Sequence, residues 1–150
     1  MRIGCFQFNP TLGQVKQNIT RVNKIIETTL QKLSKPFDIL VLPELALTGY
    51  NFQSQSEIES YLEPAGDGIS TKWAIETSKK YKCFTLVGYP ERCDQKIYNS
   101  AVLVSPSGSI IHNYRKTHLY EADEHWGCSE NPNKEFESFK IYNKNYYLKN

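Results

Sequence analysis

The sequence predicts an α/β protein with a mixed β-sheet, and three observations support that class. A short apolar stretch near the N-terminus is followed by a long amphipathic segment and then by a second apolar stretch, while two apolar arms further on flank a tight turn. Strand–helix–strand units favour parallel strands, and a hairpin adds antiparallel ones. With 150 residues, the chain has the size of one domain, because domains usually contain roughly 100–200 residues.

The first three elements follow from the spacing of apolar side chains. Residues 3–8 are short and apolar-rich, which is typical of a buried strand. Apolar residues then recur every three or four positions over residues 15–33, so we expect a helix there that Pro36 ends. Residues 38–42 form an apolar run that Pro43 cuts off, and such a run suits a strand covered on both faces.

The next elements are indicated by turns and caps as well as by apolar runs. Ser70 is a candidate N-cap for a helix that ends at about residue 80. Residues 105–108 have proline in second place and glycine in fourth, which suits a type I turn. The strands are expected at residues 83–88, 101–104 and 109–114, with a further one at residues 139–142.

Charge and composition exclude several classes of protein. The chain has 18 basic and 16 acidic residues, a net charge of +2, so we expect neither nucleic acid nor membrane as a partner. The N-terminus shows no signal-peptide pattern. The four cysteines, at positions 5, 83, 93 and 128, form no Cys-x-x-Cys pair, which indicates reduced thiols in a cytoplasmic protein. His118, His125 and Cys128 match no common zinc spacing, so a metal is not expected.

Glu44 is the first candidate catalytic residue. It comes directly after the expected strand 38–42 and Pro43. In open α/β sheets, ligands bind in the crevice outside the carboxyl ends of the strands. A carboxylate in such a crevice can act as a general base. The alternative is that Glu44 caps the segment that follows it.

Lys116 and the acidic stretch behind it are the second candidate. Lysines at strand ends are usually solvated, but beside a carboxylate Lys116 would be a fixed positive donor for a developing oxyanion. Residues 121–128 contain Glu121, Asp123 and Glu124. These carboxylates can hold the lysine, bind a cationic group of a substrate, or form a solvated loop.

Four segments together resemble the nitrilase, or carbon–nitrogen hydrolase, superfamily. They are residues 3–10, 43–50, 98–101 and 114–119, and they occur in the family's order and at plausible spacing. Residues 114–128 are most similar to the fungal-type protein N-terminal amidase branch. Members of that branch remove the side-chain amide from N-terminal Asn or Gln, which creates an N-degron.

The resemblance implies an α-β-β-α sandwich and a Glu-Lys-Cys catalytic set. Glu44 matches the general base, and Lys116 matches the residue that stabilises the oxyanion. Glu124 falls where many members have a second glutamate that positions substrate and lysine. Glu121 and Asp123 are the nearest acids for the α-amino group of a substrate. The resemblance implies no metal and no cofactor, and a homodimer is the family's usual assembly.

The catalytic cysteine of the family has no counterpart in this chain. Family members have it in a Gly-x-Cys elbow beyond the strand that matches residues 139–142, so residues 1–150 are expected to be a truncated, partial carbon–nitrogen hydrolase domain. Cys128 is the substitute nearest Lys116, but the acids around it disfavour a thiolate. A non-catalytic remnant that binds a partner and an amidase for small amides are the alternatives. Half of a sandwich leaves one apolar face open, so we expect low stability for the chain alone.

Overall fold

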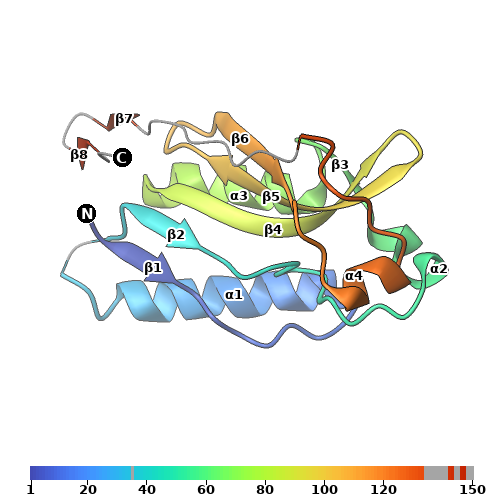
Figure 1. The fold of residues 1–150 in the computed structure, drawn as a ribbon. Coiled ribbons are helices and arrows are strands. Elements are labelled where there is room, and N and C mark those ends of the chain that lie inside the picture. The colour runs from blue at the N-terminus through green and yellow to red at the C-terminus, as the bar shows by residue number, and fades with distance from the viewer. Residues whose placement is uncertain (35, 134–141, 144–145, 148–150) are drawn as a thin grey trace.

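One β-sheet and two long helices form the body of the molecule (Figure 1). The computed structural model describes residues 1–34, 36–133, 142–143 and 146–147. The helices are α1 (Val15–Leu30), α2 (Gln55–Ile58), the 3₁₀ helix η1 (Glu59–Tyr61), α3 (Ile69–Tyr81) and α4 (Glu121–His125). The strands are β1 (Ile3–Cys5), β2 (Ile39–Val41), β3 (Glu63–Pro64), β4 (Phe84–Cys93), β5 (Lys96–Val104), β6 (Ile110–Arg115), β7 (Tyr142–Asn143) and β8 (Tyr146–Tyr147).

The main sheet has a parallel half and an antiparallel half that share β4. Its strand order is β1-β2-β4-β5-β6, with β3 paired to β4 outside this path. β1, β2 and β4 are parallel, and the connections between them contain α1 and α3, because parallel strands need a crossover. β4, β5 and β6 form two successive antiparallel pairs. The predicted α/β class is therefore confirmed.

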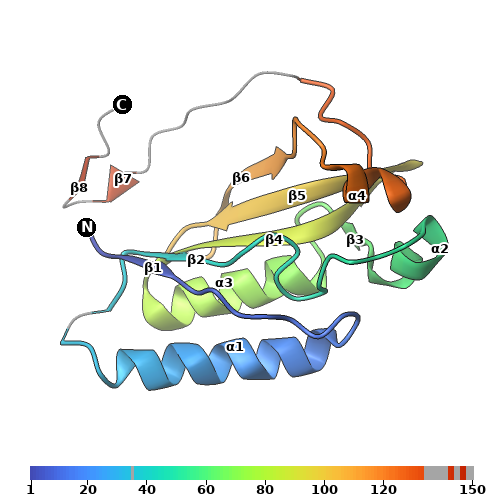
Figure 2. The ribbon, with the colours of Figure 1, turned by 60° about the horizontal axis from the view of Figure 1, so that its bottom comes forward.

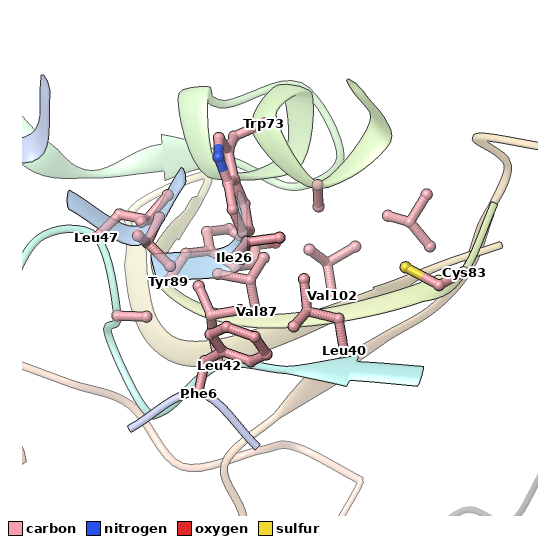
Figure 3. Packing of buried hydrophobic residues seen from close by; sticks show 14 of the residues in the cluster. Phe6, Ile26, Leu40, Leu42, Leu47, Trp73, Cys83, Val87, Tyr89 and Val102 are labelled. Carbon is pink, nitrogen blue, oxygen red and sulfur yellow. The ribbon is translucent and has the colours of Figure 1, made fainter. Parts of the chain in front are cut away.

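Helices α1 and α3 cover one face of this sheet, and the main hydrophobic core lies between the two layers (Figure 2). Ile26 of α1 and Trp73 of α3 pack there against Val87 of β4 and Val102 of β5 (Figure 3). Among the described residues, no helix is both long and apolar enough to cross a membrane.

The opposite face of the sheet contains the candidate site. Successive residues of a strand point to opposite faces, so the neighbours of the core residues in β4 and β5 lie on this face, and Tyr114 of β6 is paired with Ala101 of β5. Leu86, Ala101 and Tyr114 are partly exposed there. This face is therefore less well covered than the one that packs against α1 and α3.

The start of α3 differs from the prediction. The helix begins at Ile69 with Gly68 as its N-cap, and Ser70 lies inside the first turn. The side chain of Glu63, and not that of Ser70, accepts a backbone N–H at the start of the helix. Its carboxylate accepts hydrogen bonds from the Ser70 backbone N–H at 2.8 Å and from the Ser70 hydroxyl at 2.7 Å. A Cβ at Gly68 would lie 2.0 Å from Glu63 Oε2, so a glycine is needed here.

Strands β4 and β5 are longer than predicted, because polar residues in them are satisfied inside the protein. Glu91 of β4 is fully buried and pairs with Arg115 of β6. Its carboxylate also accepts hydrogen bonds from the Ser100 hydroxyl at 2.7 Å and from Asn113 Nδ2 at 2.8 Å. By contrast, β1 and α1 end earlier than predicted, and the strand expected at residues 139–142 falls outside the described residues except for position 142.

Candidate active site

Glu44 lies in the turn that follows β2, and this turn is pressed against β4. Leu45 has a φ of +41°, a left-handed conformation that leucine rarely adopts. A Cβ at Gly88 would lie 2.8 Å from Leu45 N and 2.9 Å from Glu44 Cα. The missing side chain of Gly88 thus lets the backbone of Glu44 approach the sheet. The Ala46 N–H fixes the turn there by donating to the Gly88 carbonyl at 3.1 Å.

Lys116 comes directly after β6, and its ammonium group bridges two carboxylates. The Nζ atom lies 2.7 Å from Glu44 Oε1 and 2.7 Å from Asp123 Oδ2. The backbone N–H of Lys116 donates to the Asn99 carbonyl at 2.8 Å, which extends the pairing of β5 and β6 by one step. The register of the antiparallel strands therefore delivers Lys116 to the turn that contains Glu44.

Asn99 completes a cluster with Glu44, Lys116 and Asp123, which we call the polar cluster. Its Nδ2 donates to Glu44 Oε1 and, at 3.1 Å, to Asp123 Oδ1. Asp123 Oδ2 also accepts the backbone N–H of Tyr120 at 3.0 Å. Both carboxylate oxygens of Asp123 are thus bonded within the protein, and the four residues come from four separate segments.

The polar cluster keeps Lys116 charged. Burial alone would lower the pKa of Lys116, but the hydrogen bonds to Asp123 and Glu44 outweigh it, so the pKa is raised. The side chain therefore remains an ammonium at neutral pH. In that state Lys116 can donate hydrogen bonds to a developing oxyanion, whereas it cannot act as a base.

The three acidic residues expected near Lys116 occupy different positions. Asp123, expected to bind the amino group of a substrate, is buried and contacts Lys116. Glu124, expected to position the lysine, is exposed on α4, as is Glu121. The acidic stretch forms a helix, in which neighbouring side chains point roughly 100° apart. Of the adjacent acids Asp123 and Glu124, it is Asp123 that faces Lys116.

A pocket of about 200 Å³ lies beside the polar cluster. Glu44, Asn99 and Lys116 line it together with apolar side chains that include Leu86 and Ala101. A larger hollow of about 520 Å³ lies between the N-terminal ends of α1 and α3, and it contains none of the polar cluster. Because ligand sites combine mostly apolar walls with a few placed polar groups, the smaller pocket is the candidate ligand site.

Cys128 is close enough to interact electrostatically with the polar cluster, but its thiol is poorly suited to attack a substrate. Burial and the negative charge of Asp123 raise the pKa of Cys128 to about 12. The thiolate is the nucleophilic form, and Cys128 stays protonated at neutral pH. All four cysteines are free thiols. In the part of the chain that the structure describes, no group of three or more His, Cys, Asp and Glu side chains is placed to hold a metal ion.

This arrangement occurs in a chain that belongs to the carbon–nitrogen hydrolase family, because the model of that family matches residues 2–140. Within the family, the chain is similar to protein N-terminal amidases. It is 43% identical over 135 residues to the one from Saccharomyces cerevisiae, which covers 88% of this chain and 29% of that protein. It is 36% identical over 132 residues to the one from Schizosaccharomyces pombe, covering 84% of this chain and 46% of that protein.

A solved structure gives the same result in three dimensions. The crystal structure of N-terminal amidase with a Gln-Val peptide superposes with a TM-score of 0.86 at 42% identity, covering 93% of this chain and 33% of that one. The predicted superfamily and its fold are therefore confirmed for the segment present here. The chain spans less than half the length of each of these three relatives.

Proposed function

We propose that this chain supplies the general base and the oxyanion donor of an amidase that deamidates N-terminal Asn or Gln of proteins. The main support is the position of Lys116 Nζ, held 2.7 Å from both Glu44 Oε1 and Asp123 Oδ2. Two relatives named protein N-terminal amidase support the substrate class. The similarity to an N-terminal amidase solved with a Gln-Val peptide supports it further.

The proposed reaction uses a cysteine thiol that is not among the four cysteines of this chain. Glu44 takes the proton of that thiol, and the thiolate attacks the carbon of the side-chain carboxamide. Lys116 donates a hydrogen bond to the resulting oxyanion. When the C–N bond breaks, Glu44 returns the proton to the leaving nitrogen, which departs as ammonia. Water that Glu44 deprotonates then hydrolyses the thioester, leaving N-terminal Asp or Glu and a free thiol.

The acids on α4 take different parts in this proposal. Asp123 holds Lys116, because both of its carboxylate oxygens already accept hydrogen bonds from the protein. Glu121 and Glu124 are exposed on the same short helix, and Glu121 is the proposed partner of the substrate α-ammonium group. We further propose that the protein acts in the cytoplasm, where its products are N-degrons. We propose a homodimer as its assembly, and we propose neither nucleic acid nor membrane as a partner.

A chimaera tests the proposed function. The 135 aligned residues of the Saccharomyces cerevisiae relative are replaced by those of this chain, so that the remaining part of that protein completes the site. We expect ammonia release from peptides with N-terminal Asn or Gln. A Glu44→Gln substitution in the chimaera should abolish that release, whereas Glu57→Gln, at an exposed acid of α2, should leave it unchanged.

Two outcomes would contradict the proposal. A chimaera that melts cooperatively but releases no ammonia from any amide would exclude a catalytic role for the polar cluster. Release from small free amides without release from the peptides would favour the alternative of a small-amide amidase. Mass spectrometry of the peptide product distinguishes deamidation from cleavage of the peptide bond. Deamidation replaces an amide by an acid, so the intact peptide should become slightly heavier.

A further inference from the structure

Helix α4 holds Asp123 against Lys116, yet it is too short to be stable by itself. It has five residues, and isolated helices shorter than roughly 12–15 residues are marginal in water. Asp123 is the buried residue of α4, while Glu121, Glu124 and His125 are exposed. The position of Asp123 must therefore be fixed by contacts outside the helix.

Trp126, which ends α4, provides the main apolar contact of this segment. It is the largest of the fully buried side chains in the described chain. Trp126 packs in a small hydrophobic cluster with Leu45, Phe52, Ile58 and Ile97. This cluster is separate from the main core, and α4 lies at the end of the molecule that also bears α2 (Figures 1 and 2).

The cluster joins three of the four segments that contribute to the polar cluster, those of Glu44, Asn99 and Asp123. Leu45 directly follows Glu44, Ile97 lies two positions before Asn99, and Trp126 lies three positions after Asp123. Backbone hydrogen bonds support the same connection. The Cys128 N–H donates to the Asp123 carbonyl at 3.1 Å, and the Ser129 N–H donates to the Ile97 carbonyl at 2.7 Å.

We infer that Trp126 is a positioning residue, which fixes Asp123, and through Asp123 the ammonium group of Lys116. Trp126 itself contacts neither substrate nor reacting atoms. The importance of this role for catalysis rests on the proposed function, whereas the placement of Lys116 can be measured without any turnover.

Trp126 should act through the packing of its ring and not through a hydrogen bond. Its indole N–H has no hydrogen-bond partner among the described residues. Trp126→Phe therefore removes volume without breaking a hydrogen bond, whereas Trp126→Leu also removes the flat aromatic surface. Trp73 is a matched control, because it is buried in the main core and donates to Asn23 Oδ1 at 2.9 Å, away from the polar cluster.

The test is an NMR titration of the lysine side chains of the 150-residue chain, with the Lys116 signal assigned through Lys116→Arg. Because the bonds to Asp123 and Glu44 raise the pKa of Lys116, Trp126→Leu should shift that pKa downward. Trp73→Leu should lower the melting temperature but leave the pKa of Lys116 unchanged. In an Asp123→Asn background, Trp126→Leu should cause no further shift, since its effect passes through Asp123.

An unchanged Lys116 pKa in folded Trp126→Leu would overturn the inference, as would an equal shift in Trp73→Leu. If Trp126→Leu does not fold, Trp126→Phe provides the test, with a smaller downward shift expected and no shift as the contradicting result. The readout is independent of amide hydrolysis. An inactive chimaera would therefore contradict the proposed function without affecting this inference, and an unmoved Lys116 pKa would do the reverse.

Discussion

Lys116 Nζ and Glu44 Oε1 lie 2.7 Å apart, although 72 positions of sequence separate the two residues. Glu44 follows β2 in the parallel half of the sheet, and Lys116 follows β6 in the antiparallel half. The contact forms because both halves share β4, against which the Glu44 turn is fixed at Gly88. A carboxylate and an ammonium group thus meet through the pairing of the strands that precede them.

Replacement of Lys116 should slow catalysis strongly without unfolding the protein. In the chimaera, Lys116→Gln should reduce kcat by about 10²–10³-fold, the loss typical when one donor to an oxyanion is removed. KM should change little, because the donor acts mainly on the transition state. Steady-state ammonia release measures both constants. Lys96→Gln, at the exposed start of β5, is the control, and equal activities of the two variants would contradict the assignment.

Asp123 and Glu124 can be distinguished by their effect on Lys116. Asp123→Asn keeps the size of the side chain but removes its charge, so the pKa of Lys116 should fall, since its bond to Asp123 helps to raise it. Glu124→Gln should leave that pKa unchanged, because Glu124 is exposed on α4. The lysine NMR titration measures both variants. The reverse pattern would return the positioning role to Glu124.

Glu91 should make the stability of the chain depend on pH. Burial by itself would raise its pKa, but hydrogen bonds from Arg115, Ser100 and Asn113 outweigh it, and the pKa is lowered. A carboxyl group with a lowered folded-state pKa adds stability that is present above its unfolded pKa and is lost as pH falls through the folded pKa. The free energy of unfolding should therefore decline on acidification below 4.5, the ordinary pKa of glutamate.

Glu91→Gln removes this contribution. At pH 7 the substitution should lower the free energy of unfolding by about 3 kcal/mol, as expected when one partner of a buried ion pair is lost. The difference from the unmodified chain should shrink in acid, and urea unfolding over a pH series measures it. Burial raises the pKa of Glu63, so the difference made by Glu63→Gln should change with pH in the opposite sense. A constant difference for Glu91→Gln would contradict the prediction.

Much of the fold could be predicted because its elements have local signals. The helix periodicity of α1, the apolar run of β2 and the 105–108 turn are all visible in sequence. The polar ends of β4 and β5 could not be predicted, since Glu91 and Ser100 are typical of loops unless a distant partner is known. Their partners, Asn113 and Arg115, become visible once the strands are paired.

Within the site, Glu44, Lys116 and Asp123 could be selected in advance, whereas Asn99 stands out only as part of the family-like segment 98–101, with no role assigned to it from the sequence. The pairing of β5 with β6 is irregular between Leu103 and Val104, so that Leu103 faces His112 but Val104 faces Ile110. If the residue pairs of β5 and β6 are assigned by counting outward from the 105–108 turn, ignoring this irregularity shifts every pair beyond it by one residue. A shift of one residue moves each side chain of a strand to the opposite face of the sheet. The register that places Asn99 beside Lys116 therefore depends on a bulge with no local sequence signal.

Cys128 should be unreactive under conditions in which an exposed thiol is labelled. Because burial and Asp123 raise the pKa of Cys128 to about 12, almost no thiolate is present at pH 8, and the thiolate is the reactive form. Iodoacetamide at pH 8 should therefore label Cys5, which is exposed, well before Cys128. Peptide mapping by mass spectrometry measures the order. Cys128→Ser should leave the activity of the chimaera unchanged, and rapid labelling of Cys128 together with loss of activity in Cys128→Ser would instead identify it as a nucleophile.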